Sequence, residues 1–558
     1  MENGMPRRVL IVGGVAGGAS TAARLRRLDE SASILLFERG PDVSFANCGL
    51  PYYLGGEIQD RSKLLVQTPQ KLAANLNLDV RVRSEVVAIH RDRKIILVRD
   101  LANQREYEES YDSLVLAPGA APIIPAFPGV KRPGVFTLRN LVDTDRIQGW
   151  ILEKDAKNAV VVGGGFIGLE MAEQLCRRGL KVTLVQRSAQ VLDPLDPEMV
   201  EAIHQSIRKH GIDLRLSTEV QQLDDPTQGA GAATVRLSDG SYVNTDIVIL
   251  GIGVQPESKL ASDAGLETNN RGAIRVNDHL QTSDPSIYAI GDAIEVKDVV
   301  SGNPTQIPLA GPANRQGRIV ANNIAGIPTT YRGTLGTAII RVFEWTAACT
   351  GASAKSLTRS KIPFKCAYLH PNSHAGYYPG AHPIHMKILF SPKDGKILGA
   401  QAVGMDGADK RIDVIATGMH HGATLDDLVD YELCYAPPFG SAKDAVNIAG
   451  MVGQNHQRKL VEIIHWSEVP SKVASGARLL DVREPKEIEA GAIPNAMHIP
   501  LGQLRKRISE LDKNTDWIVY CQSGQRSYNA CRILSQHGFR CGNLSGAYKT
   551  YSAANSKS

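Results

Sequence analysis

The sequence lacks the features that mark several large classes of protein. Its 558 residues contain no block of Lys or Arg, and 63 basic against 58 acidic residues leave a formal net charge of only +5. Nucleic acid is therefore not indicated as a partner. The apolar run Val9–Val12 is too short for the core of a signal peptide or for a membrane span, and it leads directly into glycines. We expect a cytoplasmic protein that has neither nucleic acid nor a membrane as a partner.

The eight cysteines also lack the spacings of common cysteine sites. None of them forms a CxxC pair or has the spacing of metal ligands, so no metal is expected. In a reducing compartment these thiols are free, which favours a catalytic role for one or two of them over a disulfide framework. At ~150 residues per domain, the length predicts three or four domains. The 52 glycines exceed average usage and fit several glycine-dependent nucleotide-binding turns.

The first such turn lies near the N-terminus. Glu38 ends a predicted strand twenty residues after Gly18, where an acidic side chain holds a ribose hydroxyl, and the preceding helix directs its N-terminus at a pyrophosphate. Val15 occupies the third position of the glycine motif. The expected elements are a strand at Arg8–Val12, the turn at Gly13–Gly18, a helix from about Ala19 to Leu28 and a strand at Ile34–Phe37.

A second unit of the same kind begins 150 residues later and contains a full GxGxxG motif. Its second strand ends at Gln186, followed by Arg187. An acid there would favour NAD and an arginine can accept a 2′-phosphate, so the choice between NADH and NADPH stays open. Two units imply two dinucleotides and electron transfer between them. The expected elements are a strand at Ala159–Val162, the turn at Gly163–Gly168, a helix at Leu169–Arg178 and a strand at Val182–Val185.

Three further segments, Asp112–Gly119, Asp246–Gly253 and Thr282–Asp292, each predict a buried strand that ends near glycine. With them, residues 8 to 450 or so resemble the FAD disulfide reductases that bind two dinucleotides. The resemblance implies that Asp292 holds a hydroxyl of the flavin ribityl chain. It also implies a larger set of residues that contact FAD or NAD(P)H: Gly13, Val15, Ala16, Gly17, Gly18, Glu38, Arg39, Val86, Gly119, Gly163, Gly165, Phe166, Ile167, Gly168, Gln186, Arg187, Gly253, Asp292 and Ala310.

The segment Ser44–Tyr53 carries a single cysteine, Cys48, between small and turn-forming residues. Most relatives of this kind have a CxxxxC pair, but no second cysteine follows here, so Cys48 would form a mixed disulfide, persulfide or sulfenic acid with an external partner. Ser-Phe-Ala-Asn-Cys-Gly-Leu-Pro-Tyr closely resembles the coenzyme A-disulfide reductases. Single-cysteine NADH peroxidases and oxidases share only its Ser-Phe-x-x-Cys-Gly core, and they carry a histidine where this chain has Ala16.

Two tyrosine-bearing segments, His374–Gly380 and Tyr435–Asp444, also match that branch. The resemblance implies a homodimer in which the partner subunit delivers Tyr377 and Tyr435 to the cysteine. A phenol suits this role because its pKa near 10 keeps it protonated, although the tyrosines can instead simply pack an interface. The same resemblance implies a channel for coenzyme A, lined by Ser20, Arg24, Arg27, Ser44, Asn47 and Lys443. Arginine and lysine suit the several phosphate charges of this ligand. Arg26 is expected on a solvated face.

From about Ile463 the pattern restarts and resembles the rhodaneses. Ala477–Glu484 predicts a strand with an Asp-x-Arg motif, Gly491–Pro500 is typical of the family, and the strand Trp517–Tyr520 opens into Cys521–Ser527. A six-residue loop there is expected to turn successive N–H groups toward the Cys521 sulfur, stabilising a thiolate or persulfide and lowering its pKa. Arg526 of this loop is assigned to catalysis with Cys521, whereas Cys531 and Cys541 are expected in the core. No long Gly/Ser linker precedes the module, so it is expected to be docked.

The sequence therefore predicts an α/β protein with two nested Rossmann-like domains, an α+β dimerisation domain and a C-terminal α/β rhodanese domain. The expected domains are 1–125 with 256–330 for FAD, 126–255 for NAD(P)H, 331–455 for dimerisation and 456–558 for rhodanese.

The activity predicted from these motifs is NAD(P)H-driven, FAD-dependent reduction of coenzyme A persulfide or polysulfide to sulfide and thiol, with the rhodanese domain delivering sulfur. In this hypothesis Cys48 is a thiolate stabilised by the flavin and a nearby helix dipole, and Tyr435 with Tyr377 protonates the leaving group. The alternatives are a coenzyme A-disulfide reductase for thiol balance, an NADH oxidase or peroxidase, and a sulfur carrier or sensor with a vestigial reductase.

Overall fold

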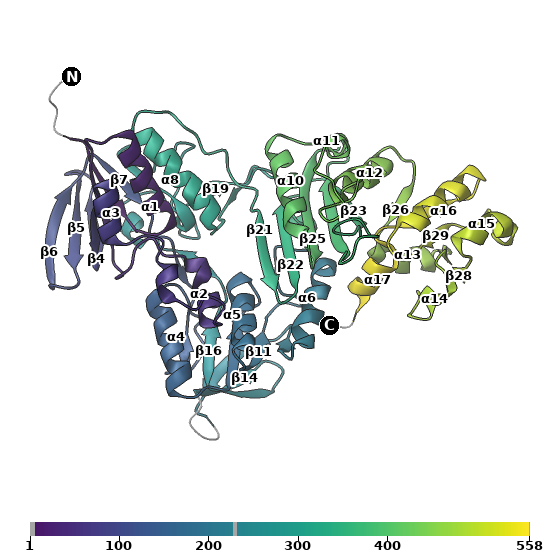
Figure 1. Cartoon of the computed structure of the whole chain (residues 1–558), viewed down its shortest axis with the longest axis horizontal. Coiled ribbons are helices and arrows are strands. Elements are labelled where there is room, and N and C mark those ends of the chain that lie inside the picture. The colour runs from purple at the N-terminus through teal and green to yellow at the C-terminus, as the bar shows by residue number, and fades with distance from the viewer. Residues whose placement is uncertain (1–5, 227–231, 557–558) are drawn as a thin grey trace. The chain divides into compact units, whose positions relative to one another are not determined.

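The computed structural model describes residues 6–226 and 232–556 and divides into two compact units (Figure 1). The first comprises Met1–Ala189 and Gly211–Thr334, and the second comprises Gln190–His210 and Leu335–Ser558. Within the described ranges, every helix is too short or too polar to cross a bilayer.

The first unit is built on two parallel sheets. One has the strand order β18-β7-β1-β2-β3, with helices α1 (Ala16–Leu28) and α8 (Ala310–Ile324) packed together beside it (Figure 1). Its central strands are apolar on both faces and buried, as parallel strands covered by helices must be. The strands are β1 (Arg8–Val12), β2 (Ser33–Glu38), β3 (Asp79–Val82), β7 (Ser113–Leu116) and β18 (Ile287–Ala289).

The other parallel sheet of this unit has the order β12-β11-β10-β16-β9. It repeats the first arrangement, because a buried central strand again leads through a glycine turn into a helix, here α5 (Phe166–Arg177). Helix α4 (Leu141–Glu153) lies between β9 and β10 in the sequence. The strands are β9 (Val135–Phe136), β10 (Asn158–Val162), β11 (Lys181–Val185), β12 (Asp213–Arg215) and β16 (Ile247–Leu250).

Two antiparallel three-stranded sheets and several short elements complete this unit. One sheet consists of β4 (Ser84–His90), β5 (Ile95–Asp100) and β6 (Arg105–Ser110). The other consists of β13 (Val220–Asp224), β14 (Ala233–Leu237) and β15 (Tyr242–Thr245). The short elements include η1 (Asn47–Gly49), α2 (Leu50–Leu54), η2 (Arg61–Leu64), α3 (Pro69–Leu76), β8 (Ala120–Pro122), β17 (Val254–Pro256), α7 (Lys259–Asp263), η3 (Gly291–Ala293), β19 (Val296–Lys297) and β20 (Pro304–Thr305).

The second unit contains an antiparallel sheet and a parallel sheet. The antiparallel sheet, β21-β22-β25-β24-β23, packs against helices α10 and α12. Its elements are α6 (Pro197–Lys209), β21 (Ala338–Val342), β22 (Trp345–Gly351), α9 (Ala354–Arg359), β23 (Lys365–Leu369), β24 (Ile384–Phe390), β25 (Ile397–Gly404), α10 (Ala408–His420), α11 (Leu425–Asp430) and α12 (Ala445–Gln457).

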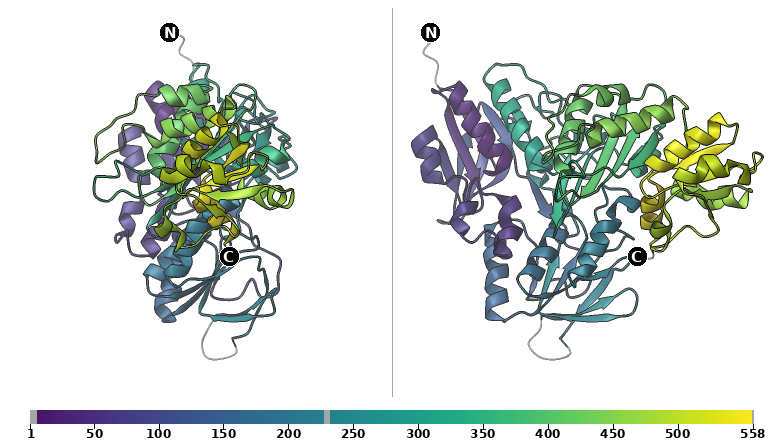
Figure 2. Two further views of the ribbon diagram at one scale, coloured as in Figure 1. Left: turned by 90° about the vertical axis from the view of Figure 1, so that its right-hand side faces the viewer. Right: turned by 45° about the vertical axis from the view of Figure 1, so that its right-hand side comes forward.

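The parallel sheet has the order β26-β30-β29-β27-β28 and its own apolar core. The right-hand view of Figure 2 shows this C-terminal part, in yellow, as a layered body of sheet and helices. Its elements are β26 (Glu462–Ile464), η4 (Trp466–Glu468), α13 (Val469–Ala474), β27 (Arg478–Asp481), α14 (Pro485–Ile488), β28 (Met497–His498), α15 (Leu501–Arg507), η5 (Ile508–Glu510), β29 (Trp517–Tyr520), α16 (Gln525–Gln536), β30 (Cys541–Leu544) and α17 (Ala547–Asn555).

The C-terminal module is docked on the antiparallel sheet, as its short connection predicts. The Tyr368 N–H donates to the Ser545 hydroxyl at 3.0 Å, and His370 Nε2 lies 2.9 Å from the Thr550 hydroxyl. Tyr368 belongs to β23 and His370 follows that strand, whereas Ser545 precedes α17 and Thr550 lies in it. All four residues belong to the second unit.

Helix α6 groups by packing with the second unit, although the sequence-based boundaries assign it to the NAD(P)H domain. The reason is a buried ion cluster. Lys387 Nζ on β24 lies 2.7 Å from carboxylate oxygens of both Asp196 and Glu198. An ammonium group this deeply buried needs such partners, so the cluster ties α6 to the antiparallel sheet. The domain boundaries given above stay predictions.

The glycine turns differ from expectation in where their helices begin. Helix α1 starts at Ala16 instead of Ala19, and α5 starts at Phe166 instead of Leu169. Gly13 and Gly163 have φ of +98° and +107°, so the chain reverses in one residue at the strand end and helical backbone follows sooner.

The expectation for Arg26 is wrong. Its side chain is buried, and the guanidinium donates to the carbonyls of Leu76 and Asn77 at 2.9 Å each. Those carbonyls are at the C-terminal end of α3, where orphan acceptors favour a cation. The guanidinium of Arg26 therefore caps the C-terminal end of α3 and does not face solvent.

Candidate functional sites

The first glycine turn has no room for side chains. A Cβ at Gly13 would overlap the Ala117 carbonyl, and one at Gly18 would overlap the Gly13 carbonyl. The Glu38 carboxylate at the end of β2 accepts N–H bonds from Gly14 at 2.9 Å and Gly40 at 2.8 Å. This close strand–turn–helix packing presents the N-terminus of α1 and an oriented carboxylate at the same sheet edge, as a dinucleotide requires.

The carboxyl of Asp292 lies in η3, directly after β18, which pairs with β7 of the same sheet. Burial raises its pKa to about 6. A partly desolvated carboxyl of this kind gains from a hydroxyl partner. The crowded glycine turn and this carboxyl therefore fit a flavin dinucleotide, whose pyrophosphate and ribityl hydroxyls they match.

Replacing Gly18 with alanine is expected to remove flavin from the purified protein. The added methyl group meets the Gly13 carbonyl, so α1 must move away from β1, at a cost of about 2–3 kcal/mol in stability. Flavin absorbance per chain and the thermal midpoint measure both effects. Gly149→Ala on α4 is the control, because a Cβ there has nothing closer than 4.0 Å. Equal flavin content in the two variants would contradict the assignment of the first turn.

The second glycine turn repeats the first with one chemical difference. The Gly164 N–H donates to Gln186 Oε1 at 2.8 Å, the counterpart of the bond from Gly14 to Glu38, so an uncharged amide occupies the acidic position. Arg187 follows, with 83% of its side chain exposed and Nε 3.7 Å from Glu219. The turn fits a nicotinamide dinucleotide, since a Cβ at Gly168 would overlap the Gly163 carbonyl.

Gln186→Glu is expected to lower kcat/KM for NADPH by about tenfold or more, because the new carboxylate would face a 2′-phosphate. The variant keeps the oxygen that accepts from Gly164, so the turn stays intact. Turnover with NADH should change much less. Measuring both nicotinamides on the same preparation provides the control, and a parallel loss with both would show that Gln186 does not face the ribose.

Cys48 lies in η1 with its side chain exposed. Its N–H donates to Asn47 Oδ1 at 3.1 Å. Partial burial, followed by the carboxylates of Glu170 and Asp292, raises the pKa of the thiol. The described protein groups therefore oppose a thiolate, in contrast to the expectation of stabilisation by a helix dipole, and the nearby α2 has only five residues. Sequence reasoning missed Glu170, which sits on α5 and accepts from the Tyr52 hydroxyl at 3.2 Å.

The residues predicted to line a coenzyme A channel lie in both units. Ser20, Arg24 and Arg27 share one side of α1 at helical spacing. Ser20 bonds to Asn314, and Arg24 Nε donates to Asn322 at 3.1 Å, both on α8. Of the others, Ser44 and Asn47 adjoin Cys48 in the first unit, whereas Lys443 is exposed in the second. Their role stays a prediction.

The structure brings the two predicted tyrosines together. The hydroxyls of Tyr377 and Tyr435 are 3.1 Å apart, and their side chains are 76% and 49% exposed. The hydrogen bond with Tyr435 raises the pKa of Tyr377, so the phenol of Tyr377 keeps its proton at neutral pH. Tyr378 and Phe439 are also exposed, and a gathering of exposed aromatic side chains is typical of an interaction surface.

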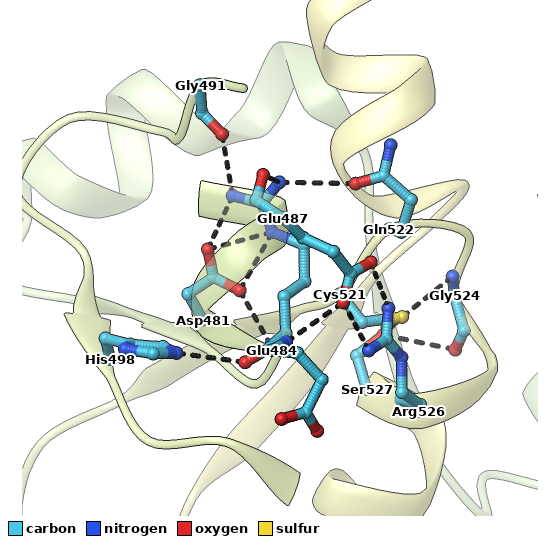
Figure 3. Close-up of polar contacts among 11 residues, drawn as sticks. Asp481, Glu484, Glu487, Gly491, His498, Cys521, Gln522, Gly524, Arg526 and Ser527 are labelled. Atoms are coloured by element: carbon cyan, nitrogen blue, oxygen red, sulfur yellow. Dashed lines mark hydrogen bonds and ion pairs between the residues drawn. The ribbon is translucent and has the colours of Figure 1, made fainter. Parts of the chain in front are cut away.

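Cys521 directly follows β29 and lies at the centre of the C-terminal site (Figure 3). Its buried Sγ accepts from the Gly524 N–H at 3.1 Å and from the Ser527 hydroxyl at 3.4 Å. The loop is shorter than expected, because α16 begins at Gln525 and includes Arg526. One loop N–H and one hydroxyl, in place of a run of N–H groups, therefore contact the sulfur. Sequence reasoning missed Ser527, although it follows the loop motif directly.

Arg526 does not stand alone beside Cys521. Its Nη1 and Nη2 donate to the two carboxylate oxygens of Glu487 at 2.6 Å each, and this pairing lowers the pKa of Glu487 (Figure 3). Sequence reasoning missed Glu487, whose only local signal is its place in a capping box with Glu484. Cys531 is buried in the core, and Cys541 is partly buried against it, as predicted.

Fold and sites define a two-dinucleotide oxidoreductase joined to a rhodanese-like module, and the chain belongs to the pyridine nucleotide-disulphide oxidoreductase family. The family of that description matches residues 7–317, its dimerisation domain matches 337–446, and a rhodanese-like domain matches 466–554. The predicted fold class is confirmed, and the chain is an oxidoreductase that uses FAD and NAD(P)H.

Three relatives are close. The structure of reduced Bacillus anthracis CoADR-RHD is 49% identical, with a TM-score of 0.96 and 98% of each chain covered. A NAD-dependent persulfide reductase from A. fulgidus is 34% identical, with a TM-score of 0.91, and covers 98% of this chain and 100% of its own. A coenzyme A disulfide reductase of Staphylococcus epidermidis is 37% identical over 80% of this chain and 100% of its own.

Proposed function

We propose that this protein reduces the persulfide of coenzyme A, or a related polysulfide, to sulfide and thiol at the expense of NAD(P)H. The observation that carries the proposal is the combination of a lone cysteine beside the flavin-type turn with a rhodanese-like domain. The coenzyme A disulfide reductase of Staphylococcus epidermidis aligns over its whole length with 80% of this chain, whereas the persulfide reductase and Bacillus anthracis CoADR-RHD each align with 98% of it. The additional module therefore favours sulfane sulfur as substrate over a plain disulfide.

In this proposal Cys48 is the nucleophile. Its Sγ attacks the carbon-bound sulfur of the persulfide, so a mixed disulfide forms and hydrosulfide leaves. FAD, when bound, supplies the two electrons that pass from nicotinamide to sulfur. These electrons cleave the mixed disulfide, which returns the Cys48 thiolate and releases coenzyme A as its thiol. Partial burial and two carboxylates raise the pKa of Cys48, so a neighbouring positive charge or the reduced cofactor must favour the thiolate.

The leaving hydrosulfide needs a proton, and the pair Tyr377 and Tyr435 is its source in this proposal. Both hydroxyls are exposed and hydrogen-bonded to each other, so one can donate while the other stabilises the resulting phenolate. The match to the dimerisation domain and the exposed aromatic side chains around the pair support delivery to the Cys48 of a second copy in a homodimer. Arg24, Arg27 and Lys443 are suited to the phosphates of coenzyme A.

The rhodanese-like module supplies the substrate in this proposal. Cys521 accepts a sulfur atom as a persulfide, which the Gly524 N–H and the Ser527 hydroxyl stabilise, and passes it to the thiol of coenzyme A. Sulfide release from coenzyme A persulfide and turnover of coenzyme A disulfide, measured on the intact protein, test the function. The persulfide is expected to be the better substrate; faster turnover of the disulfide by orders of magnitude would contradict the proposal. Oxygen or peroxide consumption as fast as persulfide turnover would support the oxidase alternative, which Ala16 disfavours.

A further inference from the structure

The C-terminal site holds its charges in a way that bears on the sulfur donor. Arg526, in the first turn of α16 directly after the Cys521 loop, has both of its terminal guanidinium nitrogens bound by Glu487 at 2.6 Å. Such a bidentate pair uses the fork geometry with which arginine otherwise binds a small oxyanion. A donor anion at this loop would have to displace Glu487 or bind without Arg526.

Glu487 is itself held in place. Its Oε2 accepts the Glu484 N–H at 2.9 Å, which completes the capping box of α14, and its carbonyl accepts from Arg483 Nη1 at 3.1 Å (Figure 3). The carboxylate therefore has two anchors, the helix cap and the guanidinium, and is not a side chain that swings away freely.

The other charges of the network do not favour an anion. Arg483 is buried and paired with Asp481 at 2.7 Å, so its charge is also neutralised. The negative charge of Glu484 adds to that of Glu487 at Arg526. With imidazole counted as neutral, these two guanidinium groups and three carboxylates leave one net negative charge beside the loop.

Two kinds of sulfane donor differ in what they demand of such a site. When a thiolate takes the outer sulfur of thiosulfate, the bond to the sulfonate sulfur breaks, and sulfite leaves with both negative charges. That donor needs uncompensated cations. When the thiolate takes the outer sulfur of a hydropersulfide, RSSH, the S–S bond breaks and the proton passes to the departing sulfur, giving RSH. In its protonated form, the sulfane group of that donor brings no charge to the site, whereas sulfur transfer from thiosulfate leaves a dianion there.

We propose that Glu487 sets the donor class of the Cys521 site: by occupying Arg526, it restricts the site to sulfur bound to a thiol, as a hydropersulfide, and excludes thiosulfate. This inference rests on the proposed function, in which Cys521 accepts sulfane sulfur. The contacts of Cys521 with Gly524 and Ser527 are uncharged and serve either donor, so the distinction depends on the charges around Arg526, with which Glu487 pairs directly.

The test uses the full-length, FAD-loaded protein and two probes, sodium thiosulfate and glutathione hydropersulfide. After quenching by alkylation, peptide mass spectrometry measures the rate of persulfide formation at Cys521. The wild type should load from the hydropersulfide and react with thiosulfate at least about tenfold more slowly. Glu487→Gln removes the charge but keeps the capping box, since glutamine also serves at that position. It should raise the thiosulfate rate by about tenfold and change the hydropersulfide rate by less than about twofold.

Glu489→Gln is the matched control, because this exposed carboxylate lies two residues away on the same short segment and should leave both rates unchanged. Equal wild-type rates with the two donors, or an unchanged thiosulfate rate in Glu487→Gln, would overturn this inference and leave the proposed function standing. Absence of loading at Cys521 from either donor would instead overturn the proposed function of the module, and this inference with it.

Discussion

Replacing Cys48 with serine is expected to lower nicotinamide-driven sulfide release by more than about a thousandfold. The hydroxyl is a far weaker nucleophile toward sulfur and cannot form the mixed disulfide through which electrons reach the substrate. The dinucleotide turns are formed by Gly13, Gly18, Gly163 and Gly168, which the substitution does not touch, so the variant should still bind flavin and still bleach its absorbance when NAD(P)H is added. Stopped-flow absorbance separates this half-reaction from sulfide release.

A second cysteine distinguishes loss of the nucleophile from loss of any exposed thiol. Cys434 is also exposed, and Cys434→Ser is expected to retain sulfide release within about twofold of the wild type. If Cys48→Ser released sulfide at the wild-type rate while its flavin was reduced normally, the single-cysteine mechanism would be wrong, whatever the substrate.

Cys521→Ser is expected to abolish sulfur loading of the C-terminal module, with a loss of more than about a thousandfold, because no other group takes the place of the sulfur at the end of β29. The same variant should reduce coenzyme A persulfide supplied directly, within about twofold of the wild-type rate. The two cysteines lie in different units, in parts of the chain that each have their own core, and the proposed reductase chemistry does not use Cys521.

The reciprocal variant completes the test. Cys48→Ser should load Cys521 normally and fail to release sulfide. The two substitutions are therefore expected to abolish different steps of the reaction: Cys521→Ser the loading of sulfur, and Cys48→Ser the release of sulfide. Sulfide release from a simple sulfur donor plus coenzyme A needs both cysteines. If Cys521→Ser left that coupled reaction unchanged, the module would serve a purpose other than sulfur delivery.

Much of the architecture could be predicted because it depends on local patterns. The strands β1, β10 and β29 occupy the residues predicted for them or differ by one residue, since short apolar runs that lead into glycine or a loop have few other uses in an α/β protein. The glycine turns were predictable for the same reason: a backbone that must pass close to another backbone tolerates no side chain, and Gly18 and Gly168 record that constraint in the sequence.

The charged side chains were harder to place. Arg26 has nearly the same sequence neighbours as Arg24 and Arg27. It is buried because the C-terminal end of α3 packs against it and accepts its hydrogen bonds. Burial raises the pKa of Cys48 most, and the carboxylate of Glu170 raises it further; Glu170 is 122 residues away in the chain and comes near only because α5 does.

The sequence by itself determined the order of the domains, the two dinucleotide turns, the lone cysteine of the reductase and the cysteine loop of the module, because each is a contiguous pattern whose residues act through their own backbone. Only the tertiary structure decided which charges meet: it paired Arg526 with Glu487, set Tyr377 beside Tyr435 and joined Lys387 to α6. Electrostatic interactions act through space over a few ångströms, and residues that close can be separated by any length of chain.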